Sequence, residues 1–182
     1  MTPFSRLAQR RLDPLGEGAN VGNMGSPAAP ALFLRETEVR RGIELLAFGH
    51  GALLRAGDEA LERHGLGRAH ARALYFIARR PDLTVTDLLG LLGITKQSLG
   101  RVLGELTERA LVITEQGARD RRQKLLRLSE AGAALEAELF ELFRRKLAAA
   151  YASAGQDAVG GFWAVLDGLL PADHKRLLAQ LG

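Results

Sequence analysis

Cysteine is absent from this chain of 182 residues. Its absence excludes disulfides, thiolate metal sites, thiol nucleophiles and regulation by cysteine oxidation. No apolar run approaches the roughly 20 residues that a membrane-spanning helix needs, and the N-terminus lacks the apolar core of a secretory signal peptide. By elimination, we expect a cytoplasmic protein with no membrane association.

Motifs typical of enzymes and metal sites are also missing. The histidines show neither an i, i+4 pair nor the spacing that is typical of zinc ligands. The sequence has no glycine-rich phosphate loop, no nucleophile elbow and no supported pair of catalytic carboxylates. We therefore predict no catalytic residue, no metal, no cofactor and no enzymatic activity.

Leucine and alanine dominate the composition, whereas aromatic residues make up only 5%. This balance favours helices, because strands prefer β-branched and aromatic residues. The formal net charge is +4. Residues 95–127 hold eight lysines or arginines against four acidic residues, so this short segment carries the whole excess. Such a cluster favours a polyanionic partner.

The first 30 residues are predicted to form a flexible basic arm. Residues 15–30 are rich in Gly, Pro, Ala, Ser and Asn, with few large apolar side chains to bury. Ahead of them, a Thr-Pro pair is suited to begin a short helix that carries three arginines. The arm has two interpretations, a DNA contact or a frayed tail upstream of a start at Met24, and the second is favoured.

Long helices are predicted on both sides of the central region. Apolar residues recur at helical spacing over residues 33–63, although four glycines weaken the pattern or mark bends and close helix contacts. Near the C-terminus, Ser129 is suited to cap a long helix. Two further helices are predicted over about 157–170 and 172–181, with Pro171 between them.

Two short helices joined by a glycine turn are predicted in the centre. A helix over 68–79 precedes a short β-like piece at 83–85. Thr86 is suited as the N-cap of a helix over 87–92, and Gly93 then makes the turn.

The second helix of this pair begins after Thr95 as its N-cap and is amphipathic. Its apolar stripe belongs to the core, and its other side bears Lys96, Gln97, Ser98 and Arg101, which together with Thr95 are predicted to contact DNA. A recognition helix in the major groove presents such residues to base edges. Arg101 is suited to guanine, Gln97 to adenine, and Lys96 to phosphate or guanine.

A hairpin with a basic tip is predicted directly after this helix, from strands over 111–114 and 124–128. Arginine suits the adjacent minor groove, where negative potential is concentrated, and Asp120 is expected to orient one arginine. The order of elements predicts a mainly α fold with a small β-hairpin wing, a winged helix-turn-helix plus long dimerisation helices. The predicted wing contacts to DNA are Arg119, Asp120, Arg121, Arg122 and Lys124.

The stretch from residue 74 through 132 closely resembles MarR-type transcriptional regulators. The D-x-R pair of the wing falls on Asp120 and Arg122, and the resemblance implies that Arg122 enters the minor groove. The flanking helices match the dimerisation helices of that family by position and length. The matching pieces are residues 83–89, 92–101, 106–112, 120–124 and 128–132.

The resemblance implies a homodimer that binds a pseudo-palindromic operator in double-stranded DNA, and repression is expected over activation only because it is the commoner result when a dimer covers a promoter. It also implies a small aromatic or anionic effector, bound between the dimer helices and the DNA-binding part. Location alone makes His50, His70, Arg72 and Tyr75 the candidate ligand-binding residues. The expected organisation is an arm at 1–30, a dimerisation helix at 31–66, the winged domain at 67–130 and dimerisation helices at 131–182.

Two features depart from the family pattern. Ala110 stands where the family usually has glycine, so the recognition helix is expected to end in a different geometry. Gly100 and Gly104 lie inside that helix, a costly choice. Either they permit close approach to DNA or to a neighbouring helix, or they only lower stability.

Two other functions stay open from the sequence. One is a DNA-binding regulator without ligand control, tuned only by its abundance. The other is a protein-interaction module that has lost DNA binding. The charged face of the second helix argues against the module, because the core of a protein-docking surface is depleted of charge.

Overall fold

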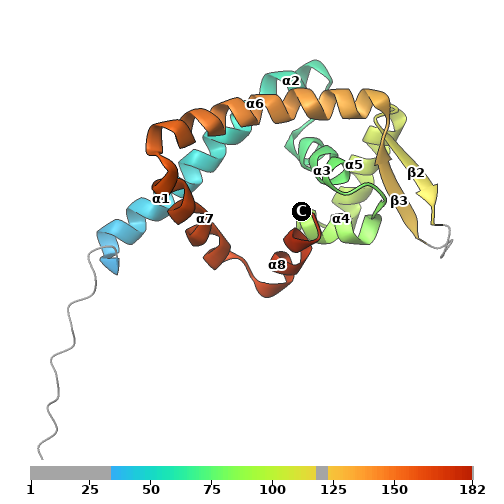
Figure 1. Cartoon of the computed structure of the whole chain (residues 1–182). Coiled ribbons are helices and arrows are strands. Elements are labelled where there is room, and N and C mark those ends of the chain that lie inside the picture. The colour runs from blue at the N-terminus through green and yellow to red at the C-terminus, as the bar shows by residue number, and fades with distance from the viewer. Residues whose placement is uncertain (1–33, 118–122, 182) are drawn as a thin grey trace, which may run out of the picture. The chain divides into compact units, whose positions relative to one another are not determined.

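The computed structural model describes residues 34–117 and 123–181. The arm predicted at 1–30 and the predicted wing residues 119–122 lie outside the described residues. By its contacts the chain divides at Arg40, within α1, and the packing described below is that of residues 41–181. The elements, labelled in Figure 1, are α1 (Glu36–Arg55), α2 (Asp58–Arg63), α3 (Arg68–Arg79), β1 (Leu83–Thr84), α4 (Val85–Leu92), α5 (Lys96–Glu108), β2 (Val112–Gln116), β3 (Lys124–Leu128), α6 (Glu130–Ala154), α7 (Gln156–Leu169) and α8 (Ala172–Ala179).

The strands form one antiparallel sheet in the order β1-β3-β2. The predicted hairpin of β2 and β3 is confirmed, with β3 at its predicted bounds. β2 extends two residues further than predicted, because its pairing with β3 continues to Gln116 opposite Lys124. The extended piece before α4 is not isolated, since Leu83 pairs with Leu126 of β3. The sheet therefore ties the hairpin to the segment that precedes α4.

The long helix predicted over residues 33–63 is broken near its end. α1 stops at Arg55 and α2 starts at Asp58. A Cβ at Gly57 would lie 2.9 Å from the ring of Phe143 on α6, so a side chain there would have to displace that ring. Of the four glycines in the sequence pattern, this one marks both a bend and a close helix contact.

The helix before the glycine turn begins earlier than predicted. The N-cap of α4 is Thr84, whose hydroxyl accepts a hydrogen bond from the Asp87 N–H at 3.0 Å. The prediction of Thr86 as N-cap is wrong because the pairing of β1 with β3 ends the extended backbone at Thr84. The helix then starts at once with Val85. Gly93 makes the predicted turn, with a φ of 60°.

The core lies around α3, which packs against α4, α5, α6 and β3. A fully buried leucine or isoleucine stabilises the fold by about 1.5–3 kcal/mol, so this layer holds the two short helices in place. The largest fully buried side chains are Leu61, Leu74, Ile77, Leu83, Leu88, Leu99, Leu106, Val112 and Leu126.

Ser129 caps α6 as predicted, because its hydroxyl accepts a hydrogen bond from the Gly132 N–H at 3.0 Å. Leu135 and Leu139 of α6 are buried, whereas none of the residues of α7 is. No helix in the described part of the chain is long and apolar enough to cross a membrane.

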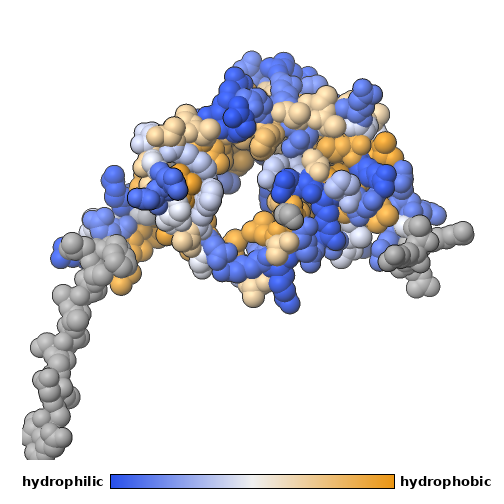
Figure 2. Space-filling model, in the orientation of Figure 1, coloured by the Kyte–Doolittle hydropathy of each residue, from blue (hydrophilic) through white to orange (hydrophobic). Residues whose placement is uncertain are grey.

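Large apolar side chains stay exposed on α1, α6 and α7. Apolar surface is visible around α1 in the space-filling view (Figure 2). The most exposed of these side chains are Phe48 at 76%, Val165 at 65% and Ile43 at 64%. The other members of this exposed apolar set are Leu45, Leu46, Phe140, Phe162, Trp163 and Leu169.

Candidate nucleic-acid interface

Helix α5 presents the polar side chains predicted for DNA contact on an exposed face. Thr95 is its N-cap, as predicted: its hydroxyl accepts from the Ser98 N–H at 3.1 Å and donates to the Ser98 hydroxyl at 2.9 Å. Lys96, Gln97 and Arg101 are exposed beside them. The first two turns therefore bring together five of the predicted residues, two of them cationic.

Gly100 and Gly104 lie on the same side of α5. At about 100° per residue, both project away from the buried Leu99 and Leu106. A Cβ at either position would meet no atom within 4 Å. Close packing against a neighbouring helix, one of the alternatives from the sequence, is therefore wrong for the described part of this chain.

The hairpin that follows α5 brings Lys124 to the start of β3, where it is exposed and pairs with Gln116. The Gly117 N–H donates to the Gln123 carbonyl at 2.9 Å, so the strands are linked as far as the described residues extend. The predicted contacts Arg119, Asp120, Arg121 and Arg122 fall within residues 118–122, which the structure does not describe.

The C-terminal end of α5 carries a left-handed residue at Ala110, whose φ is 54°. The Leu111 N–H donates to the Leu106 carbonyl and the Ala110 N–H to that of Thr107, which closes the helix end. Glycine is the usual residue in this conformation, because it lacks the Cβ that makes positive φ costly. Alanine therefore keeps the left-handed end, and the different geometry expected from the sequence is not found.

Replacing Ala110 by glycine is therefore expected to stabilise the protein. The left-handed conformation costs an alanine about 1–2 kcal/mol, and the greater freedom of glycine in the unfolded chain offsets about 0.5–1 kcal/mol of that gain. We expect a net gain of about 0.5–1 kcal/mol in the free energy of unfolding, measured by urea denaturation. A loss of stability in Ala110→Gly would contradict the strain at this helix end.

An ion pair fixes the sheet to the loop after α3. Arg127 on β3 donates to both carboxylate oxygens of Asp82, at 2.5 and 2.8 Å. Asp82 has a φ of 64°, a conformation that aspartate and asparagine tolerate better than most residues. The hydrogen bonds from Arg127 hold the pKa of Asp82 below its ordinary value of 3.8.

The substitution Asp82→Asn is expected to lower stability at neutral pH and to lose this effect in acid. Because the pKa of Asp82 is lowered in the folded state, its pair with Arg127 stabilises the fold at pH values above the ordinary pKa of the aspartate side chain. Its contribution disappears as the pH falls through the folded-state value. Thermal unfolding of both proteins from neutral pH downward measures the difference, and a gap that persists in strong acid would contradict the pairing.

Contacts distant in sequence also anchor the C-terminal half of α5. His70 on α3 lies with Nε2 3.0 Å from the Glu105 carboxylate, and its Nδ1 accepts from the Gly67 N–H at 3.0 Å. Arg109 donates to the His64 carbonyl at 2.7 Å. Sequence reasoning misses these positioning residues, since no local pattern joins partners 35 to 45 positions apart.

A cavity of about 220 Å³ lies between α1, α2, α3 and α6. An apolar cavity of about 150 Å³ is enough to hold benzene, so one aromatic ring fits here. Of the predicted ligand residues, Arg72 and Tyr75 line it, whereas His50 and His70 do not. The lining residues are Leu53, Leu54, Leu61, Arg68, Ala71, Arg72, Tyr75, Phe76 and Phe143.

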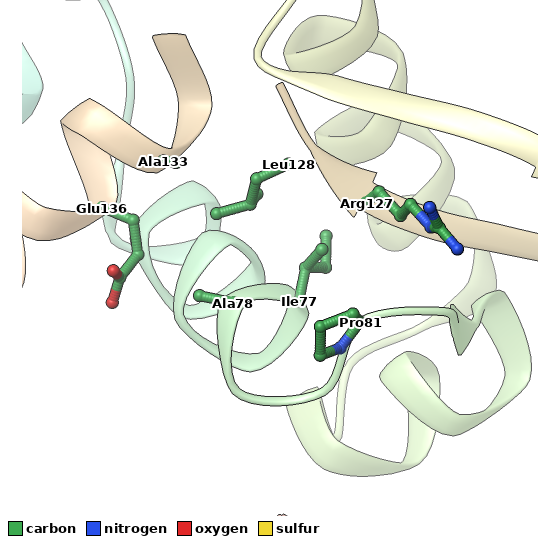
Figure 3. Close-up of a pocket in the computed structure, with 7 residues that line it drawn as sticks. All are labelled: Ile77, Ala78, Pro81, Arg127, Leu128, Ala133 and Glu136. Atoms are coloured by element: carbon green, nitrogen blue, oxygen red, sulfur yellow. The ribbon is translucent and has the colours of Figure 1, made fainter. Parts of the chain in front are cut away.

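A second hollow, of about 450 Å³, lies between the end of α3, β3 and α6. Figure 3 shows Arg127 and Glu136 on opposite sides of apolar residues that include Ile77 and Leu128. Arg127 is already paired with Asp82, and burial raises the pKa of Glu136. This hollow is therefore less suited to an anion than the first cavity, where Arg72 has no carboxylate partner among the described residues.

Comparisons with known proteins agree with this geometry. The model of the MarR family matches residues 64–123, a stretch that begins just before α3 and ends just before β3. The HTH-type transcriptional regulator PetP of Rhodobacter capsulatus is 43% identical over 157 residues, covering 86% of this chain and 95% of PetP.

Solved structures share the fold at lower identity. A mutant of MarR from E. coli, complexed with operator DNA, gives a TM-score of 0.60 at 22% identity over 78% of this chain and 99% of its own. NadR in complex with 4-hydroxyphenylacetate gives 0.62 at 22% identity over 72% of this chain and 91% of its own. With its winged helix-turn-helix and its extensive identity to PetP, this chain belongs to the MarR family of DNA-binding transcriptional regulators.

Proposed function

We propose that this protein is a homodimeric repressor that binds a pseudo-palindromic operator in double-stranded DNA. The exposed face of α5 carries the proposal. Lys96 and Arg101 are exposed there and form no ion pair among the described residues. Cations without a carboxylate partner on a helix that precedes a hairpin wing are available to phosphates and base edges.

The proposed contacts divide by chemistry. Arg101 pairs with guanine O6 and N7 through its planar fork, and Gln97 pairs with adenine. Lys96, Thr95 and Ser98 lie at the helix N-terminus, where side chains and the helix dipole favour phosphate. On the wing we propose Lys124 and, by family resemblance alone, Arg119, Asp120, Arg121 and Arg122, with Arg122 in the minor groove.

The second copy is proposed to cover the exposed apolar set of α1, α6 and α7. Contiguous apolar surface on a folded chain marks an interaction site, and side chains such as Phe48, Trp163 and Val165 are more than half exposed. The organisation proposed for the chain keeps dimerisation helices at 31–66 and 131–182 around a DNA-binding domain at 67–130. Symmetry then places two recognition helices about one turn of DNA apart.

A small aromatic carboxylate is the proposed effector, in the cavity that Arg72 and Tyr75 line. The lining is mainly apolar, and Arg72, one of its two arginines, has no carboxylate partner among the described residues, which suits an aromatic ring bearing a negative charge. The complex of NadR with 4-hydroxyphenylacetate is a precedent in a protein of the same fold. A ligand weakens operator binding if it binds best when the two DNA-binding domains of the dimer are spaced so that they do not fit the operator. The operator then weakens ligand binding by the same factor.

The glycines of α5 are proposed to allow close approach to the groove. Gly100→Ala and Gly104→Ala are each expected to stabilise the free protein by about 0.5–1 kcal/mol, because glycine disfavours a helix interior and both sites have room for a methyl group. The same methyl groups are expected to weaken operator binding. Urea denaturation and operator titration measure the two effects, and unchanged affinity would mean that the glycines only lower stability.

Selection from a random duplex pool tests the proposed function. The retained sequences are expected to contain a palindromic site, whose affinity falls steeply with salt and far exceeds that of scrambled DNA. Light scattering is expected to give twice the 19.7 kDa mass of one chain. If no motif emerges and binding stays weak at moderate salt, the repressor proposal is wrong, and a protein-interaction role is favoured.

A further inference from the structure

Arg72 connects the α1/α2/α3/α6 cavity with the helix-turn-helix. Its Nη2 donates to the Leu92 carbonyl at 2.8 Å and reaches the Leu91 carbonyl at 3.5 Å. These carbonyls belong to the last turn of α4, where helix backbone groups lack internal partners and carry partial negative charge. The same side chain lines the cavity. One side chain thus lines the cavity and, through its guanidinium, binds the end of α4.

Arg68, the other arginine of the cavity, is already neutralised. Its guanidinium donates to both oxygens of Asp58, at 2.8 and 2.5 Å. Arg72 has only carbonyl partners and no carboxylate within ion-pair distance among the described residues. A carboxylate carries a full negative charge and can accept two parallel hydrogen bonds from a guanidinium, whereas each carbonyl accepts only one, so a carboxylate in the cavity competes well for Arg72.

The carbonyl that Arg72 holds lies beside the turn between α4 and α5. Gly93, directly after Leu92, takes the left-handed conformation that makes this turn. Thr95, two residues later, is the N-cap of α5. Loss of the bond to the Leu92 carbonyl frees the end of α4. The adjacent turn at Gly93 fixes the position of the start of α5 relative to the core.

We propose that Arg72 is the positioning residue through which a carboxylate in the cavity weakens operator binding. Its guanidinium either caps the C-terminus of α4 or pairs with the ligand carboxylate, and only the first arrangement holds the turn before α5 in place. The inference rests on the proposed function, and it names the chemical class, a carboxylate, to which that function responds.

The test uses benzoate and its uncharged analogue benzamide, at equal millimolar concentrations and constant ionic strength. Operator affinity and backbone hydrogen exchange over residues 91–95 are measured for the wild type, Arg72→Gln and the control Arg79→Gln. Arg79 lies on the same helix and also donates to a backbone carbonyl, that of Leu181 at 2.8 Å, but it does not line the cavity.

For the wild type, we expect benzoate to lower operator affinity about tenfold and to speed exchange over residues 91–95, with no effect of benzamide. Arg72→Gln is expected to bind operator more weakly without ligand, to exchange faster over 91–95, and to ignore benzoate. Arg79→Gln is expected to behave like the wild type in both measurements.

The inference is overturned if Arg72→Gln still responds to benzoate, if exchange over 91–95 is unchanged by benzoate, or if benzoate and benzamide act alike. The first two results leave the proposed function standing, and the third also removes the carboxylate effector but not operator binding, provided that the wild type binds its operator specifically. Failure of the wild type to bind any operator would instead remove the proposed function, and the inference with it.

Discussion

Replacing Gly132 by alanine is expected to destabilise the protein by about 3 kcal/mol or more. A Cβ at this position would lie inside van der Waals distance of the Leu111 carbonyl oxygen and 2.9 Å from its carbon. That carbonyl is backbone, and it also accepts from the Ser129 N–H at 3.1 Å. Neither it nor the cap of α6 can move away cheaply, so the clash disturbs the junction of α5 with α6.

Urea denaturation of Gly132→Ala against wild type measures this loss, with Gly104→Ala as the matched control. Both changes add one methyl group to a helix, but Gly104 has no atom near its missing Cβ. The control is therefore expected to gain stability while Gly132→Ala loses it. Equal effects of the two substitutions would show that the close approach of Leu111 does not require glycine.

Replacing Arg101 by alanine is expected to weaken operator binding about 10- to 100-fold with little change in stability. The side chain is exposed and forms no ion pair within the described structure, so the free protein loses little when it is removed. In the complex, the substitution removes the bidentate contact to guanine that we propose for Arg101. Discrimination against other bases is therefore expected to relax at one position of each half-site.

Operator titration with every base at that position measures the effect of Arg101→Ala. Arg176→Ala on α8 is the control, because it removes the same charge from an exposed site outside the proposed interface. The control is expected to keep both affinity and specificity. A loss of affinity that is uniform across all sequences would contradict base recognition and assign Arg101 to phosphate.

Local signals in the sequence predicted much of the fold. Thr95 and Ser129 cap their helices as expected, since a cap depends on a side chain and a backbone N–H only three residues apart. The turn at Gly93 and the bounds of β3 could also be predicted from the sequence. The face of α5 followed from helical periodicity, which fixes which side chains point away from the core.

Predictions failed where two or more nearby positions in the sequence suited the same structural role equally well. Thr84 and Thr86 both suit an N-cap, and only the pairing of β1 with β3 selects Thr84. The glycine-weakened helix at the start of the chain has several positions at which it can bend, and the contact of Gly57 with Phe143 selects one of them.

By itself, the sequence determined the order of elements, the winged helix-turn-helix and the face of α5 proposed to meet DNA. Only the tertiary structure decided how these parts are joined. The pair Asp82–Arg127, and the bonds from Arg109 to His64 and from Arg72 to Leu92, link residues 20 to 45 positions apart. Short-range backbone and side-chain preferences act over a few residues, whereas such contacts exist only once the core has brought α3, α4, α5 and the sheet together.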